Sequence, residues 1–370
     1  MKVILFIGHH KVGSTSLQDF LARNSVALAQ AGILYPSVDF EGMALMLGAA
    51  TGRYAPEGVL PINAREPHNA LAFRMLAEHD KGKVPGFHKG LPARGQMERA
   101  IRKQIEFLRP EAVILAAEVF ANFAPADPAL IQGLRNIFPP EAEITVIATL
   151  RRIDDYLASW HGQRLKFGHK IAPLSAGGLQ GYFGNIHFDY RLMLEGWLKE
   201  VPEARFVLRD YADVRAAGGS VADFIAQSGL TFPEGLGPEQ RTNESLHRGV
   251  YELARRGNEV LPGPQAGALR RWLRVLTPEL DLPKSSEIEL FGEQNRAEMV
   301  DRFTPIQQFL GEVSGKAPFF PDLEAARQPL PVPEVEVFRH ALARLRGYEK
   351  DMESPEISEF LAMLGAEIIS

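Results

Sequence analysis

The sequence contains no cysteine, and this absence removes several classes of chemistry. Disulfide frameworks, thiolate nucleophiles and cysteine-ligated zinc all require a residue that the chain lacks. Its ten histidines show no H-E-x-x-H or similar ligand spacing, so the sequence predicts no metal site. We therefore expect its chemistry to depend on hydroxyl, carboxylate, imidazole and cationic side chains.

A basic surplus and a long apolar run are also missing. The formal net charge of −5 over 370 residues argues against a general nucleic-acid binder, so any phosphate recognition has to be local. No run approaches the length of a membrane span, and the apolar stretch after Met1 and Lys2 is too short for a signal peptide. We expect a cytoplasmic protein with no membrane span and no nucleic-acid partner.

Short apolar runs of the kind that form buried parallel strands recur through the first 240 residues. They are KVILFI at Lys2–Ile7, AVILAAE at Ala112–Glu118, EITVIATLR at Glu143–Arg151 and ARFVLRDY at Ala204–Tyr211. Helical periodicity separates them, at residues 14–31, 67–80, 96–108, 129–138, 154–167, 188–199 and 220–230. The Gly- and Pro-rich residues 37–67 are expected to be irregular. Alternation of this kind predicts an α/β fold with a doubly wound parallel sheet.

The last third of the chain has a different pattern. Beyond Arg241 no strand is expected, and helical periodicity runs through residues 246–261, 268–276, 288–313, 335–352 and 357–368. The Pro-rich segment LPVPEVEV, which begins at Leu330, is expected to be a linker. We therefore predict an α/β core over residues 1–240 and a mainly helical C-terminal subdomain over residues 241–370.

The segment GHHKVGSTSL, from Gly8 to Leu17, is close to the phosphate-binding pattern G-x-x-x-x-G-K-[ST]. Gly8 and Gly13 keep the spacing and Thr15 keeps the hydroxyl position, but Ser14 replaces the lysine and Lys11 lies inside the loop. A strand precedes the loop and a helix follows it, and unpaired N–H groups at a helix N-terminus bind anions. We predict a phosphate-binding loop, the alternative being a simple helix cap.

These residues also carry a resemblance to a family. GHHKVGSTSLQ resembles the 5′-phosphosulfate loop of sulfotransferases that use 3′-phosphoadenosine 5′-phosphosulfate (PAPS), with Val12 where Thr or Ser is usual. TLRRIDDYLASWHGQRLKFG, residues 149–168, is similar to the second motif of the family, and RTNESLHRG, residues 241–249, resembles a stretch of its bacterial members. The resemblance implies a P-loop-like phosphosulfate loop, PAPS as the donor and no metal. The residues that it implies for binding the donor are Gly8, His10, Lys11, Gly13, Ser14, Thr15, Ser16, Arg151, Ser159, Arg241 and Asn243.

Two residues are predicted to be catalytic. Lys11 is placed to neutralise the charge that develops on the leaving oxygen. Glu118, at the end of an apolar strand, is our candidate for the base that takes the acceptor proton. An acid in this place also occurs as a structural or metal-binding residue. The histidines that compete with it for the role of base are His9, His10 and His88.

The predicted function is transfer of a sulfuryl group to a hydroxyl of a carbohydrate, glycolipid or small metabolite. A P-loop kinase or nucleotide hydrolase, or a relative that binds nucleotide without turnover, remains the alternative. The aromatic residues near the second motif can stack on a sugar, although such residues more often belong to the core. These are Trp160, Tyr182, Phe183 and Trp197. The sequence gives no indication of the oligomeric state.

Overall fold

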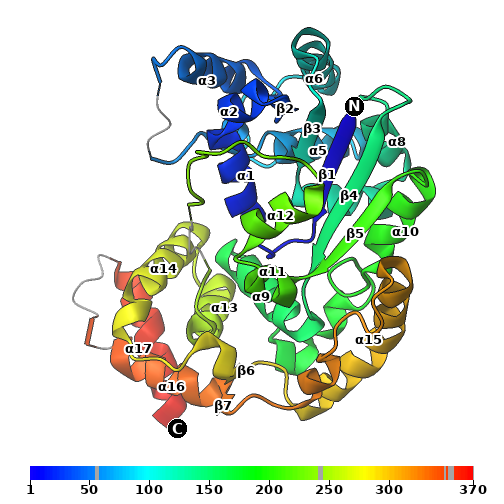
Figure 1. Cartoon of the computed structure of the whole chain (residues 1–370). Coiled ribbons are helices and arrows are strands. Elements are labelled where there is room, and N and C mark those ends of the chain that lie inside the picture. The colour runs from blue at the N-terminus through cyan, green and yellow to red at the C-terminus, as the bar shows by residue number, and fades with distance from the viewer. Residues whose placement is uncertain (55–57, 241–244, 346, 349–353, 370) are drawn as a thin grey trace. The chain divides into compact units, whose positions relative to one another are not determined.

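The computed structural model describes residues 1–54, 58–240, 245–345, 347–348 and 354–369 (Figure 1). Two compact units are present. The first consists of Met1–Arg152, Asp189–Thr242 and Ile306–Phe320, and the second of Ile153–Phe188, Asn243–Pro305 and Pro321–Ser370. Each unit draws on three segments of the chain, so neither is one continuous stretch.

The first unit is built on a five-stranded parallel sheet with the order β2-β3-β1-β4-β5. Its strands are β1 (Lys2–Gly8), β2 (Ile33–Leu34), β3 (Ala112–Ala116), β4 (Glu143–Leu150) and β5 (Arg205–Asp210). Ile4 and Phe6 of β1 join buried side chains of three helices in one apolar cluster. Leu5 and Ile7, which point to the opposite face, are buried as well. The predicted α/β fold with a parallel sheet is confirmed.

The strand order reverses direction at β1. The chain leaves β1 toward β2, whereas it leaves β4 toward β5 on the other side of β1. Parallel α/β sheets bind ligands where the direction reverses in this way, outside the carboxyl ends of the strands. The loop that begins at Gly8 and the end of β4 both lie at that edge.

Helices surround the sheet of the first unit (Figure 1). They are α1 (Ser14–Arg23), α2 (Ser25–Gln30), α3 (Phe40–Ala50), α4 (Ile62–Arg65), α5 (Pro67–His79), α6 (Arg94–Leu108), α7 (Phe123–Ala126), α8 (Ala129–Arg135), α10 (Arg191–Glu200), α11 (Tyr211–Ala216) and α12 (Ser220–Ser228). The expected single helix over residues 14–31 is wrong, because it breaks at Asn24. The side chain of Asn24 donates to the carbonyls of Phe20 and Gly237, at 2.9 and 3.2 Å, and accepts the N–H of Gly237 at 2.8 Å.

Residues 37–67 are more regular than expected. They contain α3 and α4, and the carboxylate of Asp39 caps α3 by accepting the N–H of Gly42 at 2.8 Å.

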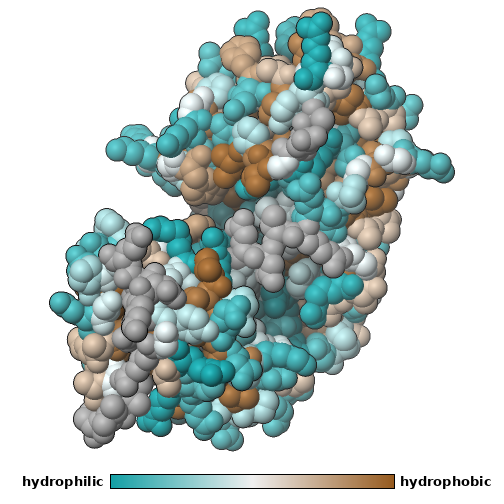
Figure 2. Space-filling model, turned by 90° about the vertical axis from the view of Figure 1, so that its left-hand side faces the viewer, coloured by the Kyte–Doolittle hydropathy of each residue, from teal (hydrophilic) through white to brown (hydrophobic). Residues whose placement is uncertain are grey.

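The large apolar side chains of Phe40, Leu47 and Val59 in this segment are exposed. Apolar side chains are visible among polar ones on the face drawn in Figure 2. The expectation of an irregular segment was wrong because α3 is apolar on several sides and lacks an amphipathic period.

The second unit is mainly helical. Its helices are α9 (Ile153–Lys166), α13 (Tyr251–Val260), α14 (Gly263–Leu276), α15 (Glu293–Ser314), α16 (Glu334–Leu345) and α17 (Pro355–Ile369), and the last residues of α15 belong to the first unit. Among the helices that the structure describes, none has the length and apolar character needed to cross a membrane.

The second unit also contains a strand pair that the sequence did not predict. β6 (Ile288–Glu289) pairs in parallel with β7 (Val332–Pro333), and α16 begins at Glu334. The expected linker at Leu330 is therefore partly β-strand and partly helix. The buried side chain of Arg296 donates a hydrogen bond to Glu289 at 2.7 Å. Glu289 also accepts the N–H of Leu330 at 2.7 Å, so it links α15 to the segment before β7.

Candidate functional site

The loop after β1 has a backbone that two glycines make possible. Gly8, Lys11 and Gly13 have left-handed φ angles of 81°, 61° and 82°, a region that favours glycine. A Cβ atom at Gly8 would lie 2.7 Å from the Cα atom of Glu118, and one at Gly13 would overlap the hydroxyl of Ser220. Both glycines of the predicted motif are therefore required by conformation and by space.

Contacts from distant parts of the chain hold this loop in place. The N–H of His9 donates to the carbonyl of Thr149 in β4 at 2.8 Å. The hydroxyl of Ser220, at the start of α12, donates to the carbonyl of Val12 at 2.8 Å. Because these contacts come from two other elements of the same unit, the loop has a defined shape before any ligand arrives.

Arg151 lies against the loop. Its guanidinium donates to the carbonyl of Lys11 at 3.5 Å and lies over the ring of Tyr211, with 5.4 Å from the guanidinium carbon to the ring centre. The hydroxyl of Tyr190 donates to the carbonyl of Arg151 at 2.8 Å and so fixes its backbone. The structure thus brings the first part of the second motif against the backbone of the loop at Lys11.

The first turn of α1 presents its N–H groups without a capping side chain among the described residues. Gly13 occupies the cap position and has no side chain, while Ser14 is buried and Thr15 and Ser16 are half-buried. Uncapped N–H groups with neighbouring hydroxyls form an anion-binding site. This geometry suits a phosphate group.

The histidines of the loop are held by the protein. The buried ring of His9 lies 5.1 Å from the ring of Tyr190, centre to centre, and its Nδ1 accepts the N–H of His10 at 2.9 Å. Burial, with a smaller effect of the Lys11 charge, lowers the pKa of His10 to about 4. A group with this pKa is a weak base at pH 7, so His10 is a poorer candidate for the base than the sequence suggested.

Glu118 lies beside the start of the loop. Strand β3 ends at Ala116, and Glu118 opens the 3-10 helix Glu118–Asn122 instead of ending the strand as expected. The side chain of Gln18 donates to a carboxylate oxygen of Glu118 at 2.8 Å and to the carbonyl of Ala116 at 3.3 Å. The carboxylate is therefore fixed in direction, as a base that must meet an acceptor hydroxyl requires.

No family model, curated protein or solved structure matches this chain. The interpretation of the site therefore depends on its own geometry.

A second carboxylate, that of Glu66, is linked to Glu118 through the side-chain amides of Asn69 and Gln18 and was not predicted from the sequence. Asn69 donates to Glu66 at 3.1 Å and to the side-chain oxygen of Gln18 at 3.4 Å. Burial is the main cause of a raised pKa at Glu66, and the charge of Glu118 raises this pKa further. The charge of Arg65 acts in the opposite direction. One signal in the sequence was Gln18 itself, a polar residue on the buried face of α1.

His88 remains a second candidate for the base. Its Nδ1 is 2.9 Å from the side-chain oxygen of Asn63, which makes Nδ1 the donor and leaves Nε2 as the acceptor. Nε2 is buried and has no hydrogen-bond partner within the described residues. Burial lowers the pKa of His88, with Glu66 acting in the opposite direction.

The three remaining predicted residues lie outside the described part of the first unit. Ser159 is a half-buried residue of α9 in the second unit, and Arg241 and Asn243 lie outside the described residues. Their roles stay predictions. Within the described part of the chain no three His, Asp or Glu side chains are grouped to hold a metal ion.

The aromatic residues suggested for sugar stacking mostly serve packing. Trp197 and Tyr182 are fully buried. Trp160 stacks on His187 with 4.1 Å between ring centres, and Phe183 lies under the guanidinium of Arg302 at 4.5 Å. Neither buried residue can offer a ring face to a sugar.

Proposed function

We propose that this protein is a PAPS-dependent sulfotransferase that acts on a hydroxyl of a carbohydrate, glycolipid or small metabolite. The observation that best supports the proposal is that one loop contacts both Arg151, through the carbonyl of Lys11, and Glu118, through the close approach at Gly8. A cation, an uncapped helix start and an oriented carboxylate are the groups that this reaction needs.

The donor fits the groups that the loop provides. The N–H groups and hydroxyls of Ser14, Thr15 and Ser16 suit its 5′-phosphate. A guanidinium such as that of Arg151 suits the 3′-phosphate, because its parallel N–H groups bind phosphate in a bidentate manner. When bound, the donor supplies a sulfuryl group attached to its 5′-phosphate. By resemblance, Ser159 binds the 3′-phosphate together with Arg151, and Arg241 and Asn243 cover the bound donor.

Each catalytic residue has one task in this proposal. The ammonium group of Lys11 stabilises negative charge on the leaving oxygen, a role for which a fixed cation is effective. The carboxylate of Glu118 accepts the proton of the acceptor hydroxyl. Gln18 keeps that carboxylate turned toward one direction.

Calorimetry with three nucleotides tests the proposal. We expect adenosine 3′,5′-bisphosphate (PAP) to bind without magnesium. AMP lacks the 3′-phosphate, so it should bind more weakly by roughly 1.5–3 kcal/mol for each charge-assisted hydrogen bond that it cannot form. Arg151→Gln should remove most of this difference, and Arg152→Gln is the matched control. Equal affinity for AMP and PAP would contradict the role of Arg151.

The same titrations separate the alternatives. Binding of ATP that requires magnesium would indicate a kinase or nucleotide hydrolase. Binding of PAP without sulfate transfer to any member of a broad panel of hydroxyl acceptors would indicate a relative without turnover.

A further inference from the structure

An open cavity of about 580 Å³ lies within the second unit. Small-molecule sites commonly have volumes of roughly 300–1,000 Å³, so this cavity is large enough for a ligand. Its walls come from α13, α16, α17 and the segments that follow Pro173 and Ile288. The lining residues on which the argument depends are Glu252, Glu289, Glu334, Glu367, Leu290 and Phe338.

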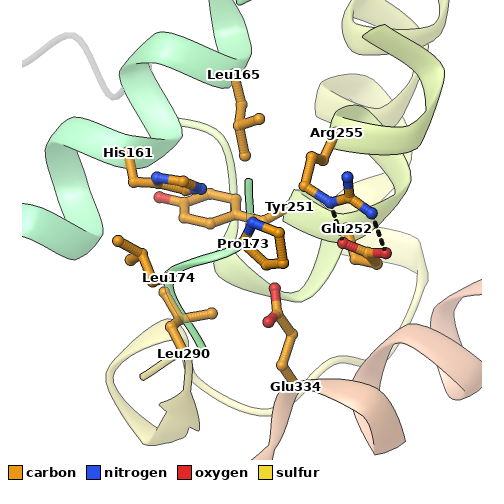
Figure 3. A pocket seen from close by; sticks show the side chains of 9 residues that line it. All are labelled: His161, Leu165, Pro173, Leu174, Tyr251, Glu252, Arg255, Leu290 and Glu334. Atoms are coloured by element: carbon orange, nitrogen blue, oxygen red, sulfur yellow. Dashed lines mark hydrogen bonds and ion pairs between the residues drawn. The ribbon is translucent and has the colours of Figure 1, made fainter. Parts of the chain in front are cut away.

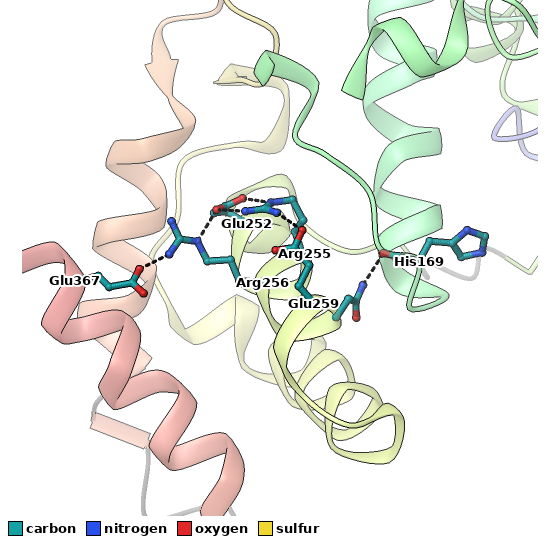
Figure 4. A network of polar contacts seen from close by, with 7 residues as sticks. His169, Glu252, Arg255, Arg256, Glu259 and Glu367 are labelled. Atoms are coloured by element: carbon teal, nitrogen blue, oxygen red, sulfur yellow. Dashed lines mark hydrogen bonds and ion pairs between the residues drawn. The ribbon is translucent and has the colours of Figure 1, made fainter. Parts of the chain in front are cut away.

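Three of the four carboxylates in this wall already have cationic partners. Glu252 accepts hydrogen bonds from Arg255 at 2.6 Å and from Arg256 at 2.7 Å. Arg256 extends the network to Glu367 on α17, as Figure 4 shows. Glu289 is paired with the buried Arg296, as described above.

Glu334 differs from these three. Within the described part of the chain its side chain makes no ion pair and no hydrogen bond. It lines both the open cavity and a narrow recess of about 10 Å³ behind it, and Figure 3 shows its carboxyl group directed toward Pro173. The charged and titratable groups that line the cavity and the recess with it are Glu252, Tyr251, Arg255 and Arg256 from α13, Glu289 from β6, His161 from α9, Arg339 from α16 and Glu367 from α17.

Among the described residues no cation forms an ion pair with Glu334, because Arg255 and Arg256 both donate to Glu252 instead. Burial raises the pKa of its carboxyl to about 8, and the charges of Glu252 and Glu289 add to the rise while Arg255 opposes it. Burial also lowers the pKa of His161 to about 3, so this neighbour supplies no positive charge at neutral pH. Glu334 is therefore protonated at pH 7 as long as the cavity holds no cation.

We propose that this cavity binds a primary ammonium ion attached to an apolar group, with the ammonium on the carboxylate of Glu334. Leu290 and Phe338 line the cavity but are largely buried, and the exposed side chains of Pro333 and Val335 in the same wall provide the apolar surface for the hydrocarbon part of the ligand. The ligand keeps its own protons, and the carboxyl of Glu334 releases one proton to solvent as the ion pair forms. This site does not depend on the sulfotransferase proposal.

Calorimetry with 2-phenylethylamine and its neutral counterpart 2-phenylethanol tests the site. At pH 7 we expect the amine to bind at least tenfold more tightly than the alcohol. Titrations in buffers of different ionisation enthalpy should show release of about one proton per amine, falling toward zero at pH 9. Glu334→Gln should weaken amine binding at least tenfold and abolish proton release.

Glu336→Gln, which changes an exposed glutamate two residues along α16, is the matched control and should leave both quantities unchanged. Equal binding of amine and alcohol, no binding of the amine, or full binding by Glu334→Gln would each overturn the proposal. If Glu334→Gln does not fold, the comparison of amine with alcohol and the proton count on the unmodified protein still decide the question.

Discussion

The candidate site in each unit contains a glutamate, and the two glutamates differ in their hydrogen-bond partners. In the first unit Gln18 donates a hydrogen bond to Glu118. In the second unit Glu334 has no partner within the described residues, and burial raises its pKa to about 8. A hydrogen-bond donor holds a carboxylate in one direction, whereas burial without a partner keeps a carboxyl protonated. The first setting suits catalysis and the second suits binding of a cation.

The largest effect is expected for Glu118→Gln, which removes the basic oxygen and keeps the size of the side chain. Loss of a general base costs roughly 10²–10⁴ in rate, so single-turnover sulfate transfer should fall by this factor. Calorimetry should show nearly unchanged affinity for PAP. Turnover within a few-fold of normal, together with loss of activity in a His88, His9 or His10 variant, would move the role of base to the imidazole.

Lys11→Ala should have the next largest effect. Removing one group that stabilises the developing charge costs roughly 10²–10³ in rate. The affinity for PAP should change much less, because the contribution of Lys11 is greatest in the transition state. Parallel measurement of transfer rate and PAP affinity checks this split, and equal losses in both would show that Lys11 only binds the donor.

The effect of Glu334→Gln on the free energy of unfolding tests the account of the second unit. The folded pKa of about 8 lies above the usual 4.5, so stability falls as pH rises from about 4.5 to 8 and then levels off. Glutamine stays neutral, and the variant should therefore be more stable than the unmodified protein above pH 8 and similar to it below pH 4.5. We expect a difference of roughly 1–3 kcal/mol at high pH, reduced because the carboxyl is partly exposed to the open cavity. Thermal unfolding from pH 4.5 to 8.5 measures it, and parallel curves would contradict the account.

The smallest expected effect concerns the two carboxylates of the first unit. The charge of Glu118 contributes to the raised pKa of Glu66, so Glu118→Gln should lower the pKa of Glu66 toward its ordinary value. Carbon-13 NMR of the carboxyl group follows this titration, and Glu106→Gln, a change at an exposed residue of α6, is the control. An unchanged pKa of Glu66 would show that the two groups do not sense each other.

The sequence predicted those parts of the fold whose signal is local. Strands β1, β3, β4 and β5 are runs of apolar residues, and such runs are typical of central parallel strands. Strands β2 and β6 are only two residues long, which is too short for a recognisable period. Strand β7 is equally short, whereas the helical periodicity expected from residue 335 places the start of α16 within one residue of its position at Glu334.

The same distinction holds for the candidate site. Spacing within ten residues was enough to predict Gly8, Lys11 and Gly13 as a loop. Glu66 could not be found in this way, because it reaches Glu118 only through the side chains of Asn69 and Gln18. The bond between Gln18 and Glu118 joins positions 100 residues apart, which only the folded chain brings together.

The hydrogen bond from Ser220 to Val12 has a consequence for synthesis. Its partners are 208 positions apart, and a ribosome delivers the loop long before it delivers the hydroxyl that holds it. A nascent chain that stops before α12 already contains β1, the loop and α1, but it lacks the side chain that fixes their shape. The loop therefore reaches its final shape late in translation, and if it binds the proposed donor, binding by a series of stalled chains should begin only after residue 220 has left the exit tunnel.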